Sequence, residues 1–151
     1  MKPLSDIKIA LCSDHAGYEL KTKLIEYLQN KGVKQFHDFG AYSADSSDYP
    51  DFAHLMATAV ASGEYEFGIS CCGTGNGINI VANRHTGVRS ALCWNAEIAR
   101  LARRHNNANV IAFPARFISE NDALTVLSVF FSTNFEGGRH QCRLDKIDTQ
   151  S

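Results

Sequence analysis

The stretch Ile69-Ser70-Cys71-Cys72-Gly73-Thr74-Gly75-Asn76-Gly77 decides how the rest of this chain is interpreted. The apolar residues 67–69 lead into it, and residues 78–84, which are compatible with a helix, follow it. The pattern predicts a strand, a tight glycine turn and a helix. Such a turn directs several backbone N–H groups at one point, which suits an oxyanion or a phosphate. The alternative is a glycine-rich turn that only reverses the chain.

The two adjacent cysteines are expected to have different roles. Successive side chains of a strand point to opposite faces, so we interpret Cys71 as a core residue and Cys72 as the candidate reactive one. A thiolate at Cys72 would be favoured by the start of the following helix. The alternative for Cys72 is a small buried apolar side chain, which is the common state of a free cysteine.

Five strand-like segments alternate with five helix-like segments, which predicts a parallel sheet with helices on both faces. We expect an α/β protein with a three-layer α/β/α Rossmann-like fold, a five-stranded parallel sheet and a C-terminal helical tail. One domain is expected to span residues 1–151, with about 135–151 as the tail. Besides the central stretch, the expected strands are 7–12, 33–39, 87–93 and 109–113.

The helices are predicted from apolar periodicity. The first has a stripe of Leu20, Leu24 and Leu28. The fourth is expected over 95–105, and Ser119 with Asp122 resembles a capping box before the fifth. The second helix should begin at 49–51 and the two glycines at 137–138 should break the fifth. The inner face of the second helix is predicted to be Phe52, Leu55, Met56, Ala59 and Val60.

In such a sheet, ligands bind beyond the carboxyl ends of the strands. The predicted strand ends are followed by Asp14 and His15, by Cys72 and its glycine loop, by Trp94 and Asn95, and by residues 114–116. We therefore expect these groups at one edge. Asp14 and His15 have the alternative of capping the first helix.

Two further features suggest chemistry. His105 lies at the end of the fourth predicted helix, where a protonated imidazole is favoured, although a surface cap is the alternative. Arg139 and Arg143 are four residues apart and, if helical, share a face that suits a dianionic phosphate; the alternative is a solvated basic turn. With Cys72 and its loop, these groups fit proton transfer beside a carbonyl in a phosphorylated substrate.

Composition narrows the class of protein. The formal net charge of -1 gives no reason to expect a nucleic-acid or membrane partner. An odd number of cysteines, five, with no C-x-x-C pair argues against a disulfide framework or zinc site and for a reducing cytoplasm. The spacing Gly73-x-Gly75-x-Gly77 differs from the dinucleotide-binding fingerprint.

Five motifs in this order resemble the type B ribose-5-phosphate isomerases of the ribose/galactose isomerase family. They are Ser13-Asp14-His15-Ala16-Gly17, Asp48-Tyr49-Pro50, Cys72-Gly73-Thr74-Gly75-Asn76-Gly77, Arg104-His105-Asn106-Asn107-Ala108-Asn109-Val110 and Gly137-Gly138-Arg139-His140-Gln141 with Arg143. The resemblance covers Ile9 to about Ile147. It implies interconversion of ribose 5-phosphate and ribulose 5-phosphate through a cis-enediolate, a step of the pentose phosphate pathway.

The resemblance also implies roles for individual residues. Cys72 would be the base that moves the proton between C1 and C2, and Thr74 with the loop amides would hold the enediolate. His105 would open the furanose ring with help from Asp14. Substrate contacts are further implied for Asp14, His15, Tyr49, Gly73, Thr74, Gly75, Asn76, Gly77, Asn106, Arg116, Arg139 and Arg143. Of these, His15 and the three arginines would bind the phosphate.

The family resemblance implies a homodimer or a dimer of dimers with sites at the subunit interface, where the tail would pack on a neighbour. It implies no cofactor and no metal. Asn76 and Trp94 depart from the usual family pattern near the expected pocket. Two other functions remain: an isomerase of a six-carbon sugar phosphate, such as allose or galactose 6-phosphate, and a flavodoxin-like binding module without catalysis.

Overall fold

The computed structural model describes residues 2–149; Met1 and residues 150–151, the end of the predicted tail, lie outside the described part. The strands are β1 (Ile9–Ser13), β2 (Phe36–Asp38), β3 (Phe67–Cys72), β4 (Ser90–Leu92) and β5 (Val110–Pro114). The helices are α1 (Tyr18–Asn30), α2 (Tyr49–Ala61), α3 (Asn76–Ala82), α4 (Ala96–Asn106), α5 (Glu120–Ser132) and α6 (Arg139–Leu144), and a 3-10 turn, η1 (Leu4–Asp6), precedes β1.

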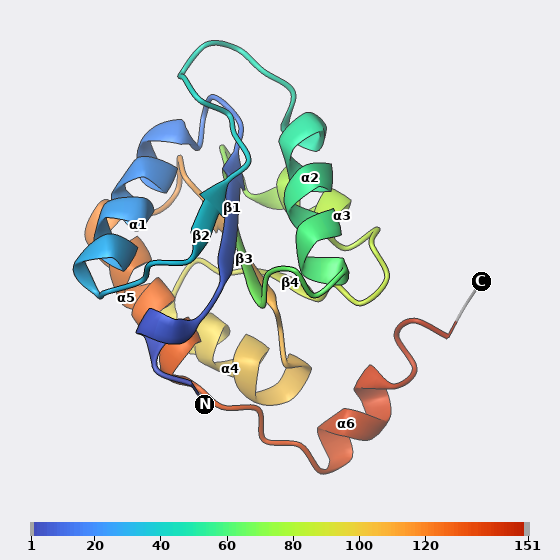
Figure 1. The fold of residues 1–151 in the computed structure, drawn as a ribbon. Coiled ribbons are helices and arrows are strands. Elements are labelled where there is room, and N and C mark those ends of the chain that lie inside the picture. Colours follow the sequence, from blue (N-terminus) through green and yellow to red (C-terminus); the bar gives the residue numbers. More distant parts are fainter. Residues whose placement is uncertain (1, 150–151) are drawn as a thin grey trace.

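The five strands form one parallel sheet in the order β2-β1-β3-β5-β4. Helices α1, α4 and α5 contribute to the core on one face, and α2 and α3 to the core on the other. Figure 1 shows the two sets of helices on either side of the strands, with α6 standing away from the rest. The predicted three-layer α/β/α fold with a C-terminal helix is confirmed.

Alternation along the strands separates the two cores. Ile9, Leu11 and Cys71 pack on the side of α1 and α5, whereas Cys12 and Cys72 pack on the side of α2 and α3. All five are buried. The predicted division of the cysteine pair between the two faces is therefore confirmed.

The register aligns the carboxyl ends of the central strands. Ser13 pairs with Cys71, and Cys72 pairs with Pro114, so β1, β3 and β5 end side by side. From β1 the chain moves to one side to form β2 and then returns past β1 to form β3. The reversal lies between β1 and β3, which is where ligands bind in open α/β sheets.

Several predicted boundaries were wrong. The second and fourth strands contain three residues each. Val33, expected in the second strand, instead closes the end of α1 by donating its N–H to the carbonyl oxygen of Leu28. Leu55 is 52% exposed, and the inner face of α2 includes Ala53 and Ala57 in its place. Helix α5 ends before the two glycines, at Ser132, where the backbone becomes extended.

No helix in the range 2–149 is both long enough and apolar enough to cross a membrane.

Candidate active site

Cys72 is the last residue of β3 and lies at the reversal point of the sheet. Its side chain is 4% exposed and belongs to the core between the sheet and helices α2 and α3. Burial raises the pKa of the Cys71 thiol well above its usual range, and burial likewise raises that of Cys12. Both neighbouring cysteines are therefore neutral thiols at physiological pH, and Cys72 is the cysteine that adjoins the glycine loop.

The loop after Cys72 depends on its glycines. Gly75 has a φ of 76°, in the left-handed region, and a Cβ there would lie 2.3 Å from Leu92 Cδ1. A Cβ on Gly77 would lie 2.5 Å from Cζ of Tyr49, so the tyrosine ring packs directly on the loop. The absence of these side chains lets α2 and β4 approach the loop closely.

Arg116 reaches the same loop from the end of β5. Its N–H donates to the carbonyl oxygen of Gly73, and its Nη1 would lie 3.2 Å from a Cβ on Gly73. Thr74 and Asn76 are exposed on the loop, and the Asn76 N–H donates to Thr74 Oγ1 at 3.2 Å. The structure thus places Cys72, the glycine loop and Arg116 at one edge, as the rule for strand ends predicted, and Tyr49 packs on the same loop.

A groove of about 550 Å³ lies beside this group and is lined by Asp14, His15, Ser46, Ser47, Asp48, Tyr49, Pro50 and Asp51. Asp14 is 7% exposed, and its Oδ1 accepts a hydrogen bond from the Gly17 N–H at 3.0 Å. This bond stabilises the turn before α1, whose first residue is Tyr18. The N-cap position itself is Gly17, and Asp14 therefore caps the turn that leads into α1 rather than the first turn of the helix.

His15 is held in the groove by Ser47. The His15 N–H donates to Ser47 Oγ at 3.1 Å, while His15 Nδ1 lies 3.2 Å from both the carbonyl oxygen and the backbone nitrogen of Ser47. Nδ1 can accept from the N–H when the ring is neutral, or donate to the carbonyl when it is protonated. The ring position therefore allows a hydrogen bond to Ser47 in either case.

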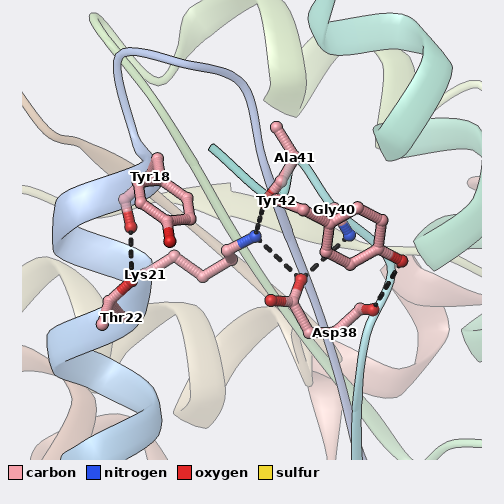
Figure 2. A network of polar contacts seen from close by, with 7 residues as sticks. All are labelled: Tyr18, Lys21, Thr22, Asp38, Gly40, Ala41 and Tyr42. Atoms are coloured by element: carbon pink, nitrogen blue, oxygen red, sulfur yellow. Dashed lines mark hydrogen bonds and ion pairs between the residues drawn. The ribbon is translucent and has the colours of Figure 1, made fainter. Parts of the chain in front are cut away.

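A buried lysine supports the loop that carries Ser47 (Figure 2). Lys21 of α1 is fully buried, and its Nζ donates to Asp38 Oδ1 at 2.8 Å and to the carbonyl oxygen of Ala41. The same carboxylate oxygen accepts from the Gly40 N–H at 2.9 Å. Tyr42 Oη donates to the carbonyl oxygen of Asp38 at 3.1 Å. These contacts connect α1 with the first residues after β2.

The remaining predicted groups lie elsewhere in the chain. Helix α4 starts beyond the carboxyl end of β4 and runs back for 11 residues, which is about 16 Å. At its far end the carbonyl oxygen of Asn107 accepts from Arg89, which directly precedes β4. His105 and Asn106 therefore lie at the amino edge of the sheet. Figure 1 shows α4 and α6 at the opposite end from the loop between β2 and α2.

Arg139 and Arg143 lie with His105 rather than with Cys72. Both are exposed on the six-residue helix α6, which contacts α4, and the predicted spacing of four residues on one helix is confirmed. The ring of His140 stacks on the ring of His105 with 4.3 Å between centroids. Burial and the proximity of His105 lower the pKa of His140. One chain thus carries two separate groups of predicted site residues.

Sequence reasoning missed the residues that support these groups. Lys21 follows Leu20 in an amphipathic helix, and nothing local distinguishes it from a surface lysine. Ser47 lies in a polar loop, and the contact between His140 and His105 joins residues 35 apart. Trp94, expected near the pocket, lines a separate cavity of about 180 Å³ with residues of α4 and α5.

The fold and the carboxyl edge of its sheet define a doubly wound α/β protein whose candidate reactive cysteine lies beside a glycine loop. Residues 9–147 match the family described as Ribose/Galactose Isomerase. The chain belongs to the ribose/galactose isomerase family.

Named relatives agree with this assignment. The ribose-5-phosphate isomerase B of Escherichia coli is 41% identical over 93% of this chain and 93% of its own length. The crystal structure of a ribose 5-phosphate isomerase from Thermotoga maritima has a TM-score of 0.93 and 48% identity, covering 96% of this chain and 99% of that one. The Mycoplasma genitalium ribose-5-phosphate isomerase B with bound ribulose-5-phosphate has a TM-score of 0.89 and 41% identity, with 94% of each chain covered.

Proposed function

We propose that this protein interconverts D-ribose 5-phosphate and D-ribulose 5-phosphate. The observation that carries the proposal is the position of Cys72, directly before a glycine loop at the reversal point of the sheet. The names of relatives more than 40% identical over most of the chain support the same substrate. The pentose phosphate pathway is the metabolic setting of this reaction.

The proposed chemistry is proton transfer by a thiolate. Cys72 removes the proton from C2 of the open-chain aldose and returns it to C1, and the intermediate is a cis-enediolate. The backbone N–H groups of 73–77 and the Thr74 hydroxyl stabilise the negative charge on the enediolate oxygens, because donors already in place need no reorganisation. Tyr49, packed on Gly77, lines the sugar pocket, and Asp14 assists from the groove.

A complete site on this proposal needs two chains. His105 and Asn106 lie about 16 Å from the carboxyl edge, the length of α4, and side-chain rotation cannot cover that distance. A second copy of the chain can present its own amino-edge group to the Cys72 loop. His105 of the partner subunit then opens the sugar ring, and Asn106 of the partner subunit contacts the substrate.

The phosphate is proposed to bind between the two chains. His15 and Arg116 contribute from the chain that holds Cys72, and Arg139 and Arg143 of the partner subunit contribute from its tail. Both tail arginines are exposed and stand on a helix that projects from the body, which suits contact with a neighbour (Figure 1). Guanidinium groups bind phosphate oxygens in pairs, and the spacing of four residues directs both to one side.

A mixing experiment tests the shared site. Cys72→Ala and His105→Asn are each expected to inactivate the protein. The two substitutions remove groups that the two different chains contribute to each site. After the two variants are unfolded together and refolded at equal concentration, half of the dimers are mixed and each mixed dimer has one intact site. The expected recovery is about one quarter of wild-type activity. No recovery, with mixed dimers shown by mass spectrometry, would refute the shared site.

The substrate itself is tested directly. Purified protein is offered ribose 5-phosphate, allose 6-phosphate and galactose 6-phosphate, and ketose formation is measured for each. We expect turnover of the five-carbon sugar with the highest kcat/KM. Preference for a six-carbon sugar would make the protein the other kind of isomerase in this family, and no turnover of any would leave a binding module.

The proposed compartment is the cytoplasm. All five cysteines are free, and four of them are buried. A free thiol base needs a reducing compartment, where it is not consumed by disulfide formation.

A further inference from the structure

His140 is a buried side chain to which the proposed reaction gives no role. It is 6% exposed, and its Nε2 has no hydrogen-bond partner among the described residues. Oε1 of Glu136 lies 3.8 Å from it, which is too long for a hydrogen bond. Buried polar atoms nearly always have a partner, so this nitrogen requires an explanation.

Two other potential ligands face the same point. His105, Glu136 and His140 each offer one nitrogen or oxygen atom, and these atoms all lie within 4.8 Å of one another. The other oxygen of the Glu136 carboxylate, Oε2, accepts from Arg104 Nη2 at 2.9 Å. That contact orients the carboxylate and leaves Oε1 directed at His140. Ligating carboxylates are commonly held in this way by a second residue.

We propose that His105, Glu136 and His140 bind a divalent transition-metal ion, with Zn²⁺ as the best fit. Two imidazoles and one carboxylate are a donor set that zinc accepts, and a fourth position stays open for water or an anion. Zinc–nitrogen bonds of about 2.0 Å place tetrahedral ligand atoms roughly 3.3 Å apart. The distances between the ligand atoms must therefore shorten by about 1.5 Å at most, and a tilt of the two stacked histidine rings can supply this change.

The surrounding charges influence what completes the site. Arg104 is paired with Glu136, and Arg139 and Arg143 lie on the helix that carries His140. These positive charges oppose a bare dication and favour an anionic fourth ligand, such as hydroxide or phosphate. A site with three protein ligands has room for that anion.

The site has a consequence for the proposed reaction, and this part of the inference rests on the proposed function. A nitrogen of His105 that is bound to zinc cannot donate a proton to the sugar ring. Zinc is therefore expected to inhibit the isomerase reversibly, and a chelator should restore activity. The reaction itself does not require the ion.

Zinc binding is measured by calorimetry on metal-free, full-length protein. We expect one Zn²⁺ per chain at this site. Loss of a residue that only supports a metal ligand typically weakens metal binding by about 10- to 100-fold, and loss of a direct ligand should weaken it at least as much. We therefore expect His140→Gln and Glu136→Gln each to raise the Kd for Zn²⁺ by about 100-fold. The matched control is His85→Gln, which removes one member of the other histidine pair, His54 and His85, and should leave this Kd within about twofold.

Other outcomes are equally informative. Equal affinity in wild type and in both ligand variants, with unchanged circular dichroism, would overturn the site, as would no zinc binding at all. Co²⁺ gives a thiolate charge-transfer band only when a cysteine is bound. Such a band, lost in Cys142→Ser, would move the ion to that exposed thiol and overturn the proposal. Zinc that binds as expected without inhibiting would support the site and count against His105 as the catalytic acid.

Discussion

Replacing Lys21 by methionine tests whether the buried ammonium stabilises the loop after β2. The side chain is fully buried, whereas that of Asp38 is 27% exposed, and Nζ lies 5.6 Å and 5.9 Å from the ring centroids of Tyr18 and Tyr42. Methionine fills most of the same volume, so packing is largely kept. The loss is therefore mainly electrostatic.

The expected cost follows from the groups left behind. The carbonyl oxygen of Ala41, a residue that is 4% exposed, loses its donor, which costs about 1–3 kcal/mol. The Asp38 carboxylate loses its counter-ion but keeps the Gly40 N–H and access to water, which limits its penalty. Together these give about 3 kcal/mol, at the lower end of the 3–5 kcal/mol typical for breaking a buried pair. Asp38→Asn should cost more, because the ammonium of Lys21 cannot reach water.

The matched control lies on the same helix. Lys23 pairs with Glu26 at 3.7 Å, and its side chain is 47% exposed. Lys23→Met removes the same charge and should cost less than about 1 kcal/mol. Urea unfolding followed by far-UV circular dichroism measures all the variants, at one protein concentration because association contributes to stability. A Lys21→Met variant within about 1 kcal/mol of Lys23→Met would refute the reasoning.

Three further predictions concern single positions. Cys72→Ala should lower kcat by about 10²- to 10⁴-fold, whereas Cys71→Ala should keep most of kcat, as measured by ketose formation. Both side chains are buried, so each variant should lose about 1 kcal/mol of stability in urea unfolding. Full activity in Cys72→Ala would exclude the thiolate base. Gly77→Ala should raise KM several-fold, because the new methyl group displaces the ring of Tyr49, and an unchanged KM would remove that ring from the pocket. Burial, and then the neighbouring His54, lower the pKa of His85 below its ordinary value of 6.5. The unfolded chain therefore binds a proton at this histidine more readily than the folded chain does. As a result, the free energy of unfolding falls as the pH drops through 6.5. His85→Gln should therefore lose less stability between about pH 7 and pH 5, and an identical pH dependence would contradict the shift.

The fold could be predicted because its signals are local. Each buried strand is a short apolar run, and the turn after Cys72 needs glycines that are visible in the sequence. The edge at which Asp14, Cys72 and Arg116 meet then follows from the rule for parallel sheets. Strand lengths were less predictable, because apolar residues such as Val33 also close helices.

The supporting contacts could not be predicted because they join distant residues. Lys21 of α1 pairs with Asp38 at the end of β2, 17 residues further along the chain, and an amphipathic helix gives no sign of that contact. The distance between Cys72 and His105 follows from the direction of α4 relative to the sheet. Residue types indicated the chemistry, but only the arrangement shows that one chain carries the groups at two opposite edges.

The sheet order has a consequence for synthesis. Within residues 2–149, β4 is an edge strand that pairs only with β5, and β5 lies between β4 and the central strand β3. On the ribosome, β4 therefore emerges without a partner and stays unpaired until residues 110–114 have been made. The pairing of β3 with β5 joins residues that are 42 apart in the sequence, such as Gly68 and Val110. Such long-range pairing of parallel strands forms late and slowly. A nascent chain that stalls before residue 110 therefore exposes one edge of β3.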